Sequence, residues 1–384
     1  MKHIRILVTG GGSGGHIYPI IAVVEQLKKL GVSGGAALDV RYFGSAGSYE
    51  PELAGAGIRI TRIAPSKLRR YLSFWNAVDF IRFIWSIPQA LAKVFWFMPD
   101  VAFSKGGPGA VAVLGACRFY RIPIVIHDSD AIPGLSSRAT GRFAKKIELA
   151  FPSAAQYFPA QKANVRIVGV PVREGLIVQE EERTQRAALD AKRALDMDPA
   201  LPLILVLGGS QGAAGINTFI MENLSLFLER YNVLHQVGME NFSAYRDALR
   251  ASPFARLSQT IQRRYRPVPF FTRDLKTALI AADLVMSRAG AGALFEIAMA
   301  GKPSILIPLP NSASNHQAEN AFQYREAGAC IVIEEENLIG NLVLEQIDAL
   351  MKNPERLKKM SANATLFYKP DAATNIAKDI LSVI

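Results

Sequence analysis

The sequence predicts an α/β protein of two similar domains, each built on a parallel β-sheet. The chain has 384 residues, half of them hydrophobic, which is more than one ordinary domain needs. Apolar strand-like runs alternate with helix-like segments, and the alternation pauses around residues 168–174 before it starts again. We therefore expect one domain at 1–168 and a second at 169–369, with a C-terminal helix at about 370–384 returning to the first domain.

The elements follow in order along the chain. In the first half, strands are expected at 4–8, 38–44, 100–104 and 122–128, and a helix covers 20–30. A charged helix-like segment at 180–195 opens the second half, and strands are expected there at 203–207, 232–238, 283–288, 304–309 and 330–335. The pair Lys369-Pro370 ends the helical pattern before the terminal segment.

Composition narrows the class of protein. The two cysteines, Cys117 and Cys330, both lie in apolar segments and are expected in the core, so neither structural zinc nor thiol redox chemistry is indicated. The N-terminus passes directly into a strand-like run without a signal-peptide pattern, which favours the cytoplasm.

A formal charge of +11 indicates an acidic partner. Much of the excess lies in one stretch, residues 59–105, where eight Lys and Arg face two Asp. The stretch lacks any nucleic-acid-binding module and is interleaved with apolar bulk, so no nucleic-acid partner is expected. Its basic residues are Arg59, Arg62, Lys67, Arg69, Arg70, Arg82, Lys93 and Lys105.

Two glycine-rich loops each follow a strand and precede a helix. The first, TGGGSGGH, has the G-x-G-x-x-G spacing, and the second is GGSQGA at 208–213. Backbone N–H groups at such a loop and helix N-terminus favour an anion. A dinucleotide is excluded because no acidic residue ends the strand at 38–44, and a nucleoside triphosphate loop because His16-Ile17 stand where Lys and Ser/Thr are required.

His16 comes directly after the last glycine of the first loop. A histidine in the first turn of a helix can cap or pack, but next to an anion site, and with a pKa near neutrality, it is also suited to act as a general base. We expect the second role.

The motifs GGGSGGHIYPIIAV, VLGGSQGA, MSRAGAGALFEIAMAGKPSILIPLP and NHQAENA occur in this order, and together they strongly resemble the MurG family of peptidoglycan N-acetylglucosaminyltransferases. The resemblance spans essentially the whole chain. It implies a GT-B fold, two Rossmann-like α/β domains with an interdomain cleft. It also implies transfer of N-acetylglucosamine from UDP-GlcNAc to the C4 hydroxyl of MurNAc in lipid I, with inversion, to form lipid II.

The resemblance assigns the donor mainly to the second half and the lipid-linked acceptor to the first. Glu296 is expected to bind the ribose hydroxyls, Phe271 to lie beside uracil unless it is a core residue, and Arg173 to reach uracil or phosphate unless it is a surface residue. His316 and Gln317 are expected to face the donor sugar, with Asn320 and Arg288 in support. The remaining donor-site candidates are Ser13, Gly14, Gly15, Gly209, Ser210, Gln211, Thr272, Gly292, Ala293 and Leu294.

The acceptor loops depart from the family pattern. The sequence has HDSD at 127–130 where the family usually has HEQN, and GGPG at 106–109 without the usual aromatic residue. Asp128 or Asp130 is therefore an alternative base to His16, unless the two merely cap the next turn. Four glycines are expected beside the acceptor's diphosphate: Gly11, Gly12, Gly106 and Gly107.

The segment 67–98 combines basic and aromatic residues, including Lys67, Arg69, Arg70, Phe74 and Trp75. Charges and Pro88 interrupt any run long enough to span a bilayer, so an interfacial helix on an anionic membrane is expected, or else a helix packed on the sheet. The resemblance places the protein peripherally on the cytoplasmic face of the cell membrane, where cell-wall synthesis proteins are possible partners. No metal or other cofactor is expected. The alternatives are another GT-B glycolipid synthase, such as one acting on diacylglycerol, and a non-catalytic UDP-sugar-binding membrane protein.

Overall fold

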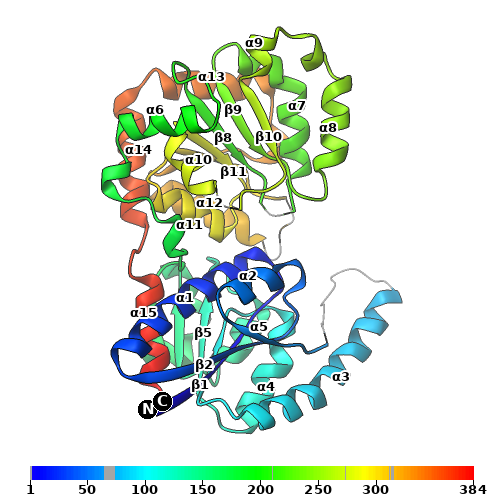
Figure 1. The fold of residues 1–384 in the computed structure, drawn as a ribbon, viewed down its shortest axis with the longest axis vertical. Helices are drawn as coiled ribbons and strands as arrows, with labels where there is room; N and C mark the ends of the chain where they lie inside the picture. The colour runs from blue at the N-terminus through cyan, green and yellow to red at the C-terminus, as the bar shows by residue number, and fades with distance from the viewer. Residues whose placement is uncertain (1, 65–73, 210, 273, 311, 313–314) are drawn as a thin grey trace. The chain divides into compact units, whose positions relative to one another are not determined.

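The computed structural model describes residues 2–64, 74–209, 211–272, 274–310, 312 and 315–384 (Figure 1). The chain divides into unit 1, Met1–Arg173 with Lys369–Ile384, and unit 2, Glu174–Tyr368. Each unit contains one parallel sheet, which confirms the predicted α/β class. The boundary expected at residue 168 lies just before this division.

Unit 1 has a seven-stranded sheet, counted over its described residues, in the order β3-β2-β1-β4-β5-β6-β7. Its helices include one that begins in the first glycine loop and one at the end of the chain. The strands are β1 Lys2–Thr9, β2 Ala36–Phe43, β3 Arg59–Thr61, β4 Val101–Ser104, β5 Ile124–Asp128, β6 Lys146–Leu149 and β7 Val165–Ile167, and the helices α1 Gly14–Ser33, α2 Glu50–Gly55, α3 Phe74–Phe97, α4 Val111–Phe119, α5 Leu135–Gly141 and α15 Ala372–Ser382.

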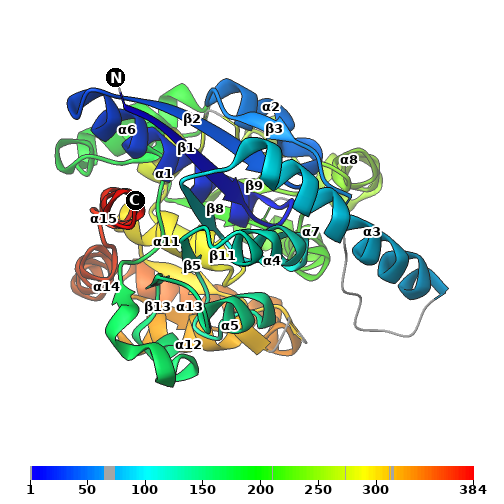
Figure 2. The ribbon, with the colours of Figure 1, turned by 90° about the horizontal axis from the view of Figure 1, so that it is seen from below.

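The strands of unit 1 are apolar on both faces because helices cover both faces. Along β1, Ile6 and Val8 belong to one core cluster with residues of α1 and α15, whereas Leu7 belongs to a second cluster with residues of α3 and α4. This alternation follows from the two-residue repeat of a strand. The helix α15 packs on α1, as seen from below in Figure 2, and contributes Ile376 and Ile380 to the first cluster.

Unit 2 has a six-stranded sheet within its described residues, in the order β10-β9-β8-β11-β12-β13. One core cluster of unit 2 contains Val206 of the sheet together with Phe219 and Phe227 of α7 and the following Tyr231. The strands are β8 Leu203–Leu207, β9 Asn232–Gln236, β10 Tyr265–Val268, β11 Leu284–Ser287, β12 Ser304–Leu306 and β13 Cys330–Val332, and the helices α6 Gln185–Ala194, α7 Ala214–Leu228, α8 Phe242–Ala251, α9 Gln259–Gln262, α10 Leu275–Ala281, α11 Ala291–Met299, α12 His316–Glu326, α13 Gly340–Met351 and α14 Pro354–Phe367.

The strand orders position the glycine loops. In unit 1 the order reverses between β1 and β4, and in unit 2 between β8 and β11. Parallel α/β sheets bind ligands outside the carboxyl ends of the strands at such a reversal, because the two crossover helices leave on opposite faces and open a crevice. The glycine loops follow β1 and β8, so each lies at the reversal point of its own sheet.

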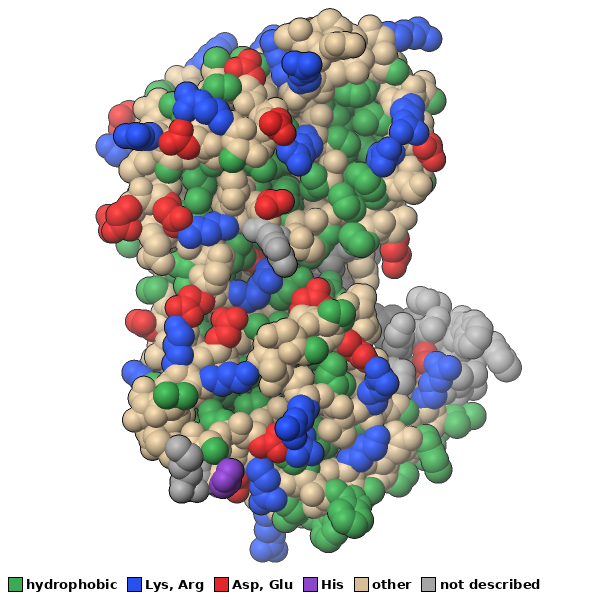
Figure 3. Space-filling model, in the orientation of Figure 1, with side chains coloured by type: hydrophobic (Ala, Val, Ile, Leu, Met, Phe, Trp, Pro, Cys, Tyr) green, Lys and Arg blue, Asp and Glu red, His purple; other side chains and the backbone are tan. Residues whose placement is uncertain are grey.

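The helix α3 presents an unusual surface. Its buried stripe consists largely of small side chains such as Ser86, Ala90 and Val94, whereas large apolar side chains face outward. Trp85 is 63% exposed and Trp96 is 84% exposed. Figure 3 shows hydrophobic side chains at the lower right of the view, where α3 lies in Figure 1. Among the described residues, no helix combines the length and the apolarity required to cross a membrane.

Both cysteines are buried and free, as expected from their apolar surroundings.

Candidate active site

In unit 1, the loops after β1 and β4 touch each other. Thr9 and Ser104 are register partners, and the Lys105 N–H donates to the Thr9 carbonyl at 2.9 Å. Gly107 has a positive φ of 94°, and a Cβ there would lie 2.9 Å from the backbone nitrogen of Gly11. Only glycine permits this conformation together with such a close approach, so the loops after β1 and β4 form one surface within unit 1.

His16 lies over this surface from the first turn of α1. Its Nδ1 is 2.8 Å from the hydroxyl of Ser13, and its Nε2 is 3.6 Å from the position that a Cβ would take at Gly107. The pKa of His16 is lowered to about 4 by burial and by the positive charge of Lys105, while Asp130 acts in the opposite direction. The ring is therefore neutral at physiological pH and can accept a proton.

Lys105 is buried at the end of β4, with only 4% of its surface exposed. Its Nζ lies 2.7 Å from Nδ1 of His127 and also donates to the hydroxyl of Ser129. His127 is fully buried, and its Nε2 faces the Gly169 carbonyl at 2.8 Å. A carbonyl only accepts hydrogen bonds, so Nε2 carries the ring proton and Nδ1 accepts from the ammonium. The prediction that Lys105 belongs to the basic excess that meets an acidic partner is wrong, because its charge is used inside the unit.

The two aspartates of the HDSD segment differ in their surroundings. Asp128 is buried, and its carboxylate accepts from the N–H groups of Asp130 at 3.1 Å and Gly134 at 3.2 Å. Burial, then the neighbouring Asp130 carboxylate, raises the pKa of Asp128. Both carboxylate oxygens thus accept from N–H groups of the following turn, as in the capping alternative, and the role of Asp128 as a base stays a prediction. Asp130 is only partly buried and acts electrostatically on His16.

In unit 2, the loops after β8 and β11 form a second backbone surface. Among the residues that the structure describes, a Cβ at Gly209, Gly290 or Gly292 would meet no atom within 4 Å. By contrast, Gly212 has a φ of 81° and touches the loop after β9, where a Cβ would collide with the Val237 carbonyl. The helices α7 and α11 begin at these loops, and their N-terminal N–H groups favour a negatively charged ligand.

Gln236, the last residue of β9, joins the loop after β8 to the loop after β10. Its Nε2 donates to the Gly209 carbonyl at 2.8 Å, and its Oε1 accepts from the Phe271 N–H at 3.2 Å. The side chain is almost fully buried. The position of the glycine loop therefore depends on the position of the loop that carries Phe271.

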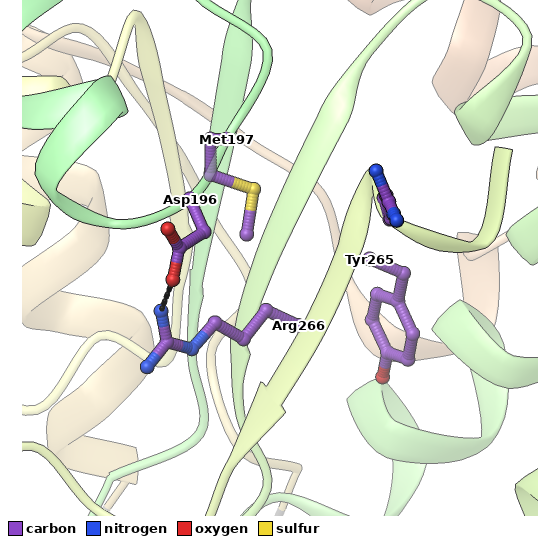
Figure 4. A pocket seen from close by; sticks show the side chains of 5 residues that line it. Asp196, Met197, Tyr265 and Arg266 are labelled. Atoms are coloured by element: carbon purple, nitrogen blue, oxygen red, sulfur yellow. Dashed lines mark ion pairs between the residues drawn. The ribbon is translucent and has the colours of Figure 1, made fainter. Parts of the chain in front are cut away.

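A separate open hollow of about 560 Å³ in unit 2 is lined by Asp196, Met197, Arg263, Tyr265 and Arg266. Figure 4 shows the ion pair between Asp196 and Arg266, 3.9 Å apart. The hollow lies beside residues that precede β8 or begin β10. It is therefore at the amino end of the sheet, away from the glycine loop.

Comparisons with known proteins match both units of the chain. Residues 6–148 match the glycosyltransferase family 28 N-terminal domain, and residues 203–379 match the C-terminal domain of the same family. A Treponema pallidum relative, named UDP-N-acetylglucosamine–N-acetylmuramyl-(pentapeptide) pyrophosphoryl-undecaprenol N-acetylglucosamine transferase, is 33% identical over 99% of this chain and 95% of its own. A Clostridium perfringens relative of the same name is 33% identical over 93% of this chain and 92% of its own.

The chain belongs to the MurG family. The crystal structure of MurG from Acinetobacter baumannii covers all of both chains with a TM-score of 0.71 at 25% identity. A UDP-GlcNAc 2-epimerase from Neisseria meningitidis, with a TM-score of 0.67 at 14% identity, shares the fold alone. The predicted membership of the MurG family and the predicted GT-B fold are thus confirmed.

Several residues expected at the donor site from the MurG resemblance lie in unit 2, on the loops after β8 and β10 and on the helices α11 and α12. Glu296 is half-buried on α11 among buried apolar neighbours, and Phe271 is buried at the end of the loop that follows β10. Gln317, near the start of α12, accepts from the Leu309 N–H at 3.0 Å. The other expected residues of these loops are Gly209, Gln211, Thr272, Gly292, Ala293, Leu294 and His316.

Two residues expected in support are turned into the protein. Arg288 is buried, donates to the carbonyls of Ile307 and Pro308, and pairs with Glu335. Asn320 is fully buried and donates to the Ala289 carbonyl at 3.1 Å. They fix the loops after β11 and β12.

The remaining predicted residues lie elsewhere. Ser13, Gly14, Gly15 and Arg173 belong to unit 1, where Arg173 stacks over the Tyr18 ring at 3.9 Å. Ser210 and the basic residues Lys67, Arg69 and Arg70 lie outside the described residues. The side chains of Phe74 and Trp75, at the start of α3, lie outside them as well.

Three residues that support these loops were not found from the sequence. Lys105 and Gln236 are two of them. The third is Tyr42, which is buried and donates from its hydroxyl to the Gly10 carbonyl at 2.9 Å. The described part of the chain contains no group of three or more His, Cys, Asp or Glu side chains arranged for a metal ion.

Proposed function

We propose that this protein transfers N-acetylglucosamine from UDP-GlcNAc to the C4 hydroxyl of MurNAc in lipid I, which forms lipid II for peptidoglycan synthesis. The observation that carries the proposal is the similarity over 99% of the chain to a relative named for this reaction. The similarity spans both units and therefore includes the glycine-rich loops after β1 and β8, to which we assign the acceptor and the donor.

The donor is assigned to unit 2. The N–H groups of the loops at 208–213 and 288–292, with the starts of α7 and α11, bind the diphosphate. Glu296 accepts hydrogen bonds from the ribose hydroxyls, and Phe271 lies beside uracil. His316 and Gln317, at the start of α12, contact the donor sugar. As UDP leaves, these fixed dipoles stabilise its growing charge, so no metal ion is required.

The acceptor is assigned to unit 1, with its diphosphate over the loops that contain Gly11, Gly12, Gly106 and Gly107. His16 is the base. For this role Nδ1 donates its proton to the Ser13 hydroxyl, and the lone pair of Nε2 is then available. A diphosphate nearby adds negative charge, which raises the pKa of His16 and makes it a better proton acceptor.

The reaction is a single displacement. The oxygen of the acceptor's C4 hydroxyl attacks C1 of the sugar as the bond from C1 to the UDP oxygen breaks. The hydroxyl proton passes to Nε2 of His16, and the bonding electron pair leaves with UDP. Attack from the face opposite the leaving group inverts the configuration at C1.

The protein acts at the cytoplasmic face of the cell membrane, as a peripheral protein. Support comes from α3, whose outward side chains include Phe80, Ile81, Trp85 and Trp96. A contiguous exposed apolar face of this kind is typical of an interaction surface. Aromatic residues beside basic ones suit the headgroup region of an anionic bilayer, which also holds the lipid-linked acceptor.

Transfer from radiolabelled UDP-GlcNAc to a short-chain lipid I analogue tests the proposal. We expect a disaccharide product, at the same rate with and without EDTA. A parallel assay with diacylglycerol tests the glycolipid-synthase alternative. Binding of UDP-GlcNAc without any product, in a preparation whose fold is verified by circular dichroism, would favour the non-catalytic alternative.

A further inference from the structure

Lys105 occupies a position in unit 1 that the proposed reaction does not yet use. It is buried, so it cannot contact a substrate, and it follows β4 directly before Gly106 and Gly107. Its backbone N–H holds the end of β1 through the Thr9 carbonyl. Lys105 thus contacts the end of β1, before the first glycine-rich loop, and is adjacent to Gly106 and Gly107 in the loop after β4.

The ammonium of Lys105 also joins β4 to the loop after β5. It donates to Nδ1 of His127 and to the hydroxyl of Ser129. His127 is fixed in turn by the Gly169 carbonyl at 2.8 Å. A buried ammonium is costly without partners, and these two acceptors offset that cost.

Lys105 and His16 lie on the same side of Gly10. A Cβ at Gly10 would be 3.3 Å from the Cβ of Lys105 and 3.5 Å from the Cβ of His16. The buried positive charge of Lys105 opposes protonation of the His16 imidazole, since little water screens the two groups. The charged or titratable groups around Lys105 are His16 from α1, His127 and Asp128 from β5, and Asp130 from the following loop.

We propose that Lys105 is a positioning residue for the transfer reaction: its buried ammonium fixes the loop after β5 through His127 and Ser129, and its charge makes protonation of the neighbouring His16 ring less favourable. The inference rests on the proposed function, in which His16 accepts the acceptor's proton. The burial of the ammonium lowers the pKa of Lys105 to about 8, against the effect of the two aspartates. The positive charge is therefore largely present at neutral pH.

The test is titration of His16 by NMR in the full chain, with histidine labelled at Cε1. The protein has five histidines, and the His16→Asn variant assigns the signal. Lys105→Gln and Lys105→Met remove the charge, whereas Lys105→Arg keeps it. A matched control is Lys192→Gln, because Lys192 is another buried lysine, in unit 2, bonded to the Leu201 carbonyl at 3.0 Å.

In Lys105→Gln and Lys105→Met we expect the pKa of His16 to rise by about one unit, the usual effect of losing one nearby charge. Lys105→Arg and Lys192→Gln are expected to titrate as the parent does. An unchanged His16 titration in both neutral variants overturns the inference. If circular dichroism shows that neither neutral variant folds, Lys105 is only a structural residue and the inference is also overturned.

The pH profile of transfer to the lipid I analogue separates this inference from the proposed function. We expect the acidic limb of the rate profile to move upward by the same amount as the NMR titration. A shift by NMR without a shift of the acidic limb would support the electrostatic link and overturn His16 as the base. A protein inactive at every pH that shows the NMR shift would support the inference and contradict the proposed function.

Discussion

The side-chain amide of Gln236 donates a hydrogen bond to the Gly209 carbonyl at 2.8 Å. The same side chain accepts from the Phe271 N–H. One buried glutamine therefore fixes both the loop proposed to bind the donor diphosphate and the loop proposed to contact uracil.

Gln236→Leu is expected to weaken UDP binding by about ten- to a hundredfold. The substitution removes one hydrogen bond from the Gly209 carbonyl, which still accepts from the Gly212 N–H at 3.2 Å, and it removes the partner of the Phe271 N–H. Loss of a buried hydrogen-bond partner costs about 1–3 kcal/mol. Isothermal titration with UDP measures the effect. The control is Gln262→Leu, which removes a glutamine bonded to the Leu257 carbonyl at 2.8 Å, away from the glycine loop. Equal UDP affinities in the two variants would contradict the role given to Gln236.

His16→Ala is expected to lower kcat by about 10²–10⁴-fold, the usual contribution of a general base. UDP affinity should remain unchanged, because the UDP site is assigned to unit 2. Ser13→Ala should have a smaller effect, since it removes only the group that orients the ring. His3→Ala, at an exposed position on β1, is the control. A parental kcat in His16→Ala would rule out the assignment.

Glu148 makes unit 1 sensitive to alkaline pH. Burial, followed by interaction with Asp379 of α15, raises the pKa of Glu148 to about 8. The pKa of Glu148 in the folded state lies above its unfolded value of about 4.5. Protonated Glu148 therefore contributes fully to the stability of unit 1 below pH 4.5, and this contribution is lost as the pH rises through 8. Glu148→Gln stays neutral, and unit 1 of this variant should be more stable than the parent at pH 9, by a few kcal/mol at most.

Urea unfolding at pH 6 and pH 9 measures this difference. All three tryptophans, Trp75, Trp85 and Trp96, lie in α3, so their fluorescence reports on unit 1. Glu345→Gln, at an exposed position of α13, controls for the loss of one carboxylate. The same change with pH in Glu148→Gln and in the parent would show that Glu148 does not cause it.

The protein is expected to sediment with phosphatidylglycerol vesicles at low salt and to be released at high salt, because charge attracts it and salt screens that charge. Substitution of Lys67, Arg69 and Arg70 by Ser should release it, and so should Trp85→Ser with Trp96→Ser. Leu366→Ser removes an equally exposed apolar side chain from unit 2 and is the control. Binding that is indifferent to both salt and the three basic residues would count against the membrane surface.

The local features of the fold could be predicted from the sequence. Apolar runs separated by helical segments fix the class because strands buried on both faces contain few polar residues. The glycine spacing before α1, with His16 directly after it, indicated the loop and its anion site. The orientation of the apolar face of α3 could not be predicted, because a helical pattern does not show whether such a face meets the sheet or solvent.

The supporting contacts could not be predicted in this way. Lys105 and His127 are 22 positions apart, and they meet because β4 and β5 are neighbours in the sheet. Gln236 reaches Gly209 and Phe271 for the same reason, through the order β10-β9-β8. Strand order depends on packing across the whole unit. The sequence alone therefore does not show that Lys105, beside two glycines, is buried.

The packing of α15 on α1 affects how the protein is made. The helix α1 carries His16 at its start, and α15 is synthesised after unit 2, which lies between the two chain segments of unit 1. Domains generally fold during synthesis, with the N-terminal one first. Here unit 2 can fold before unit 1 is complete, because the core beneath α1 lacks Ile376 and Ile380 until α15 has been synthesised. A nascent chain that stops before α15 thus has an incomplete core beneath the helix that carries His16.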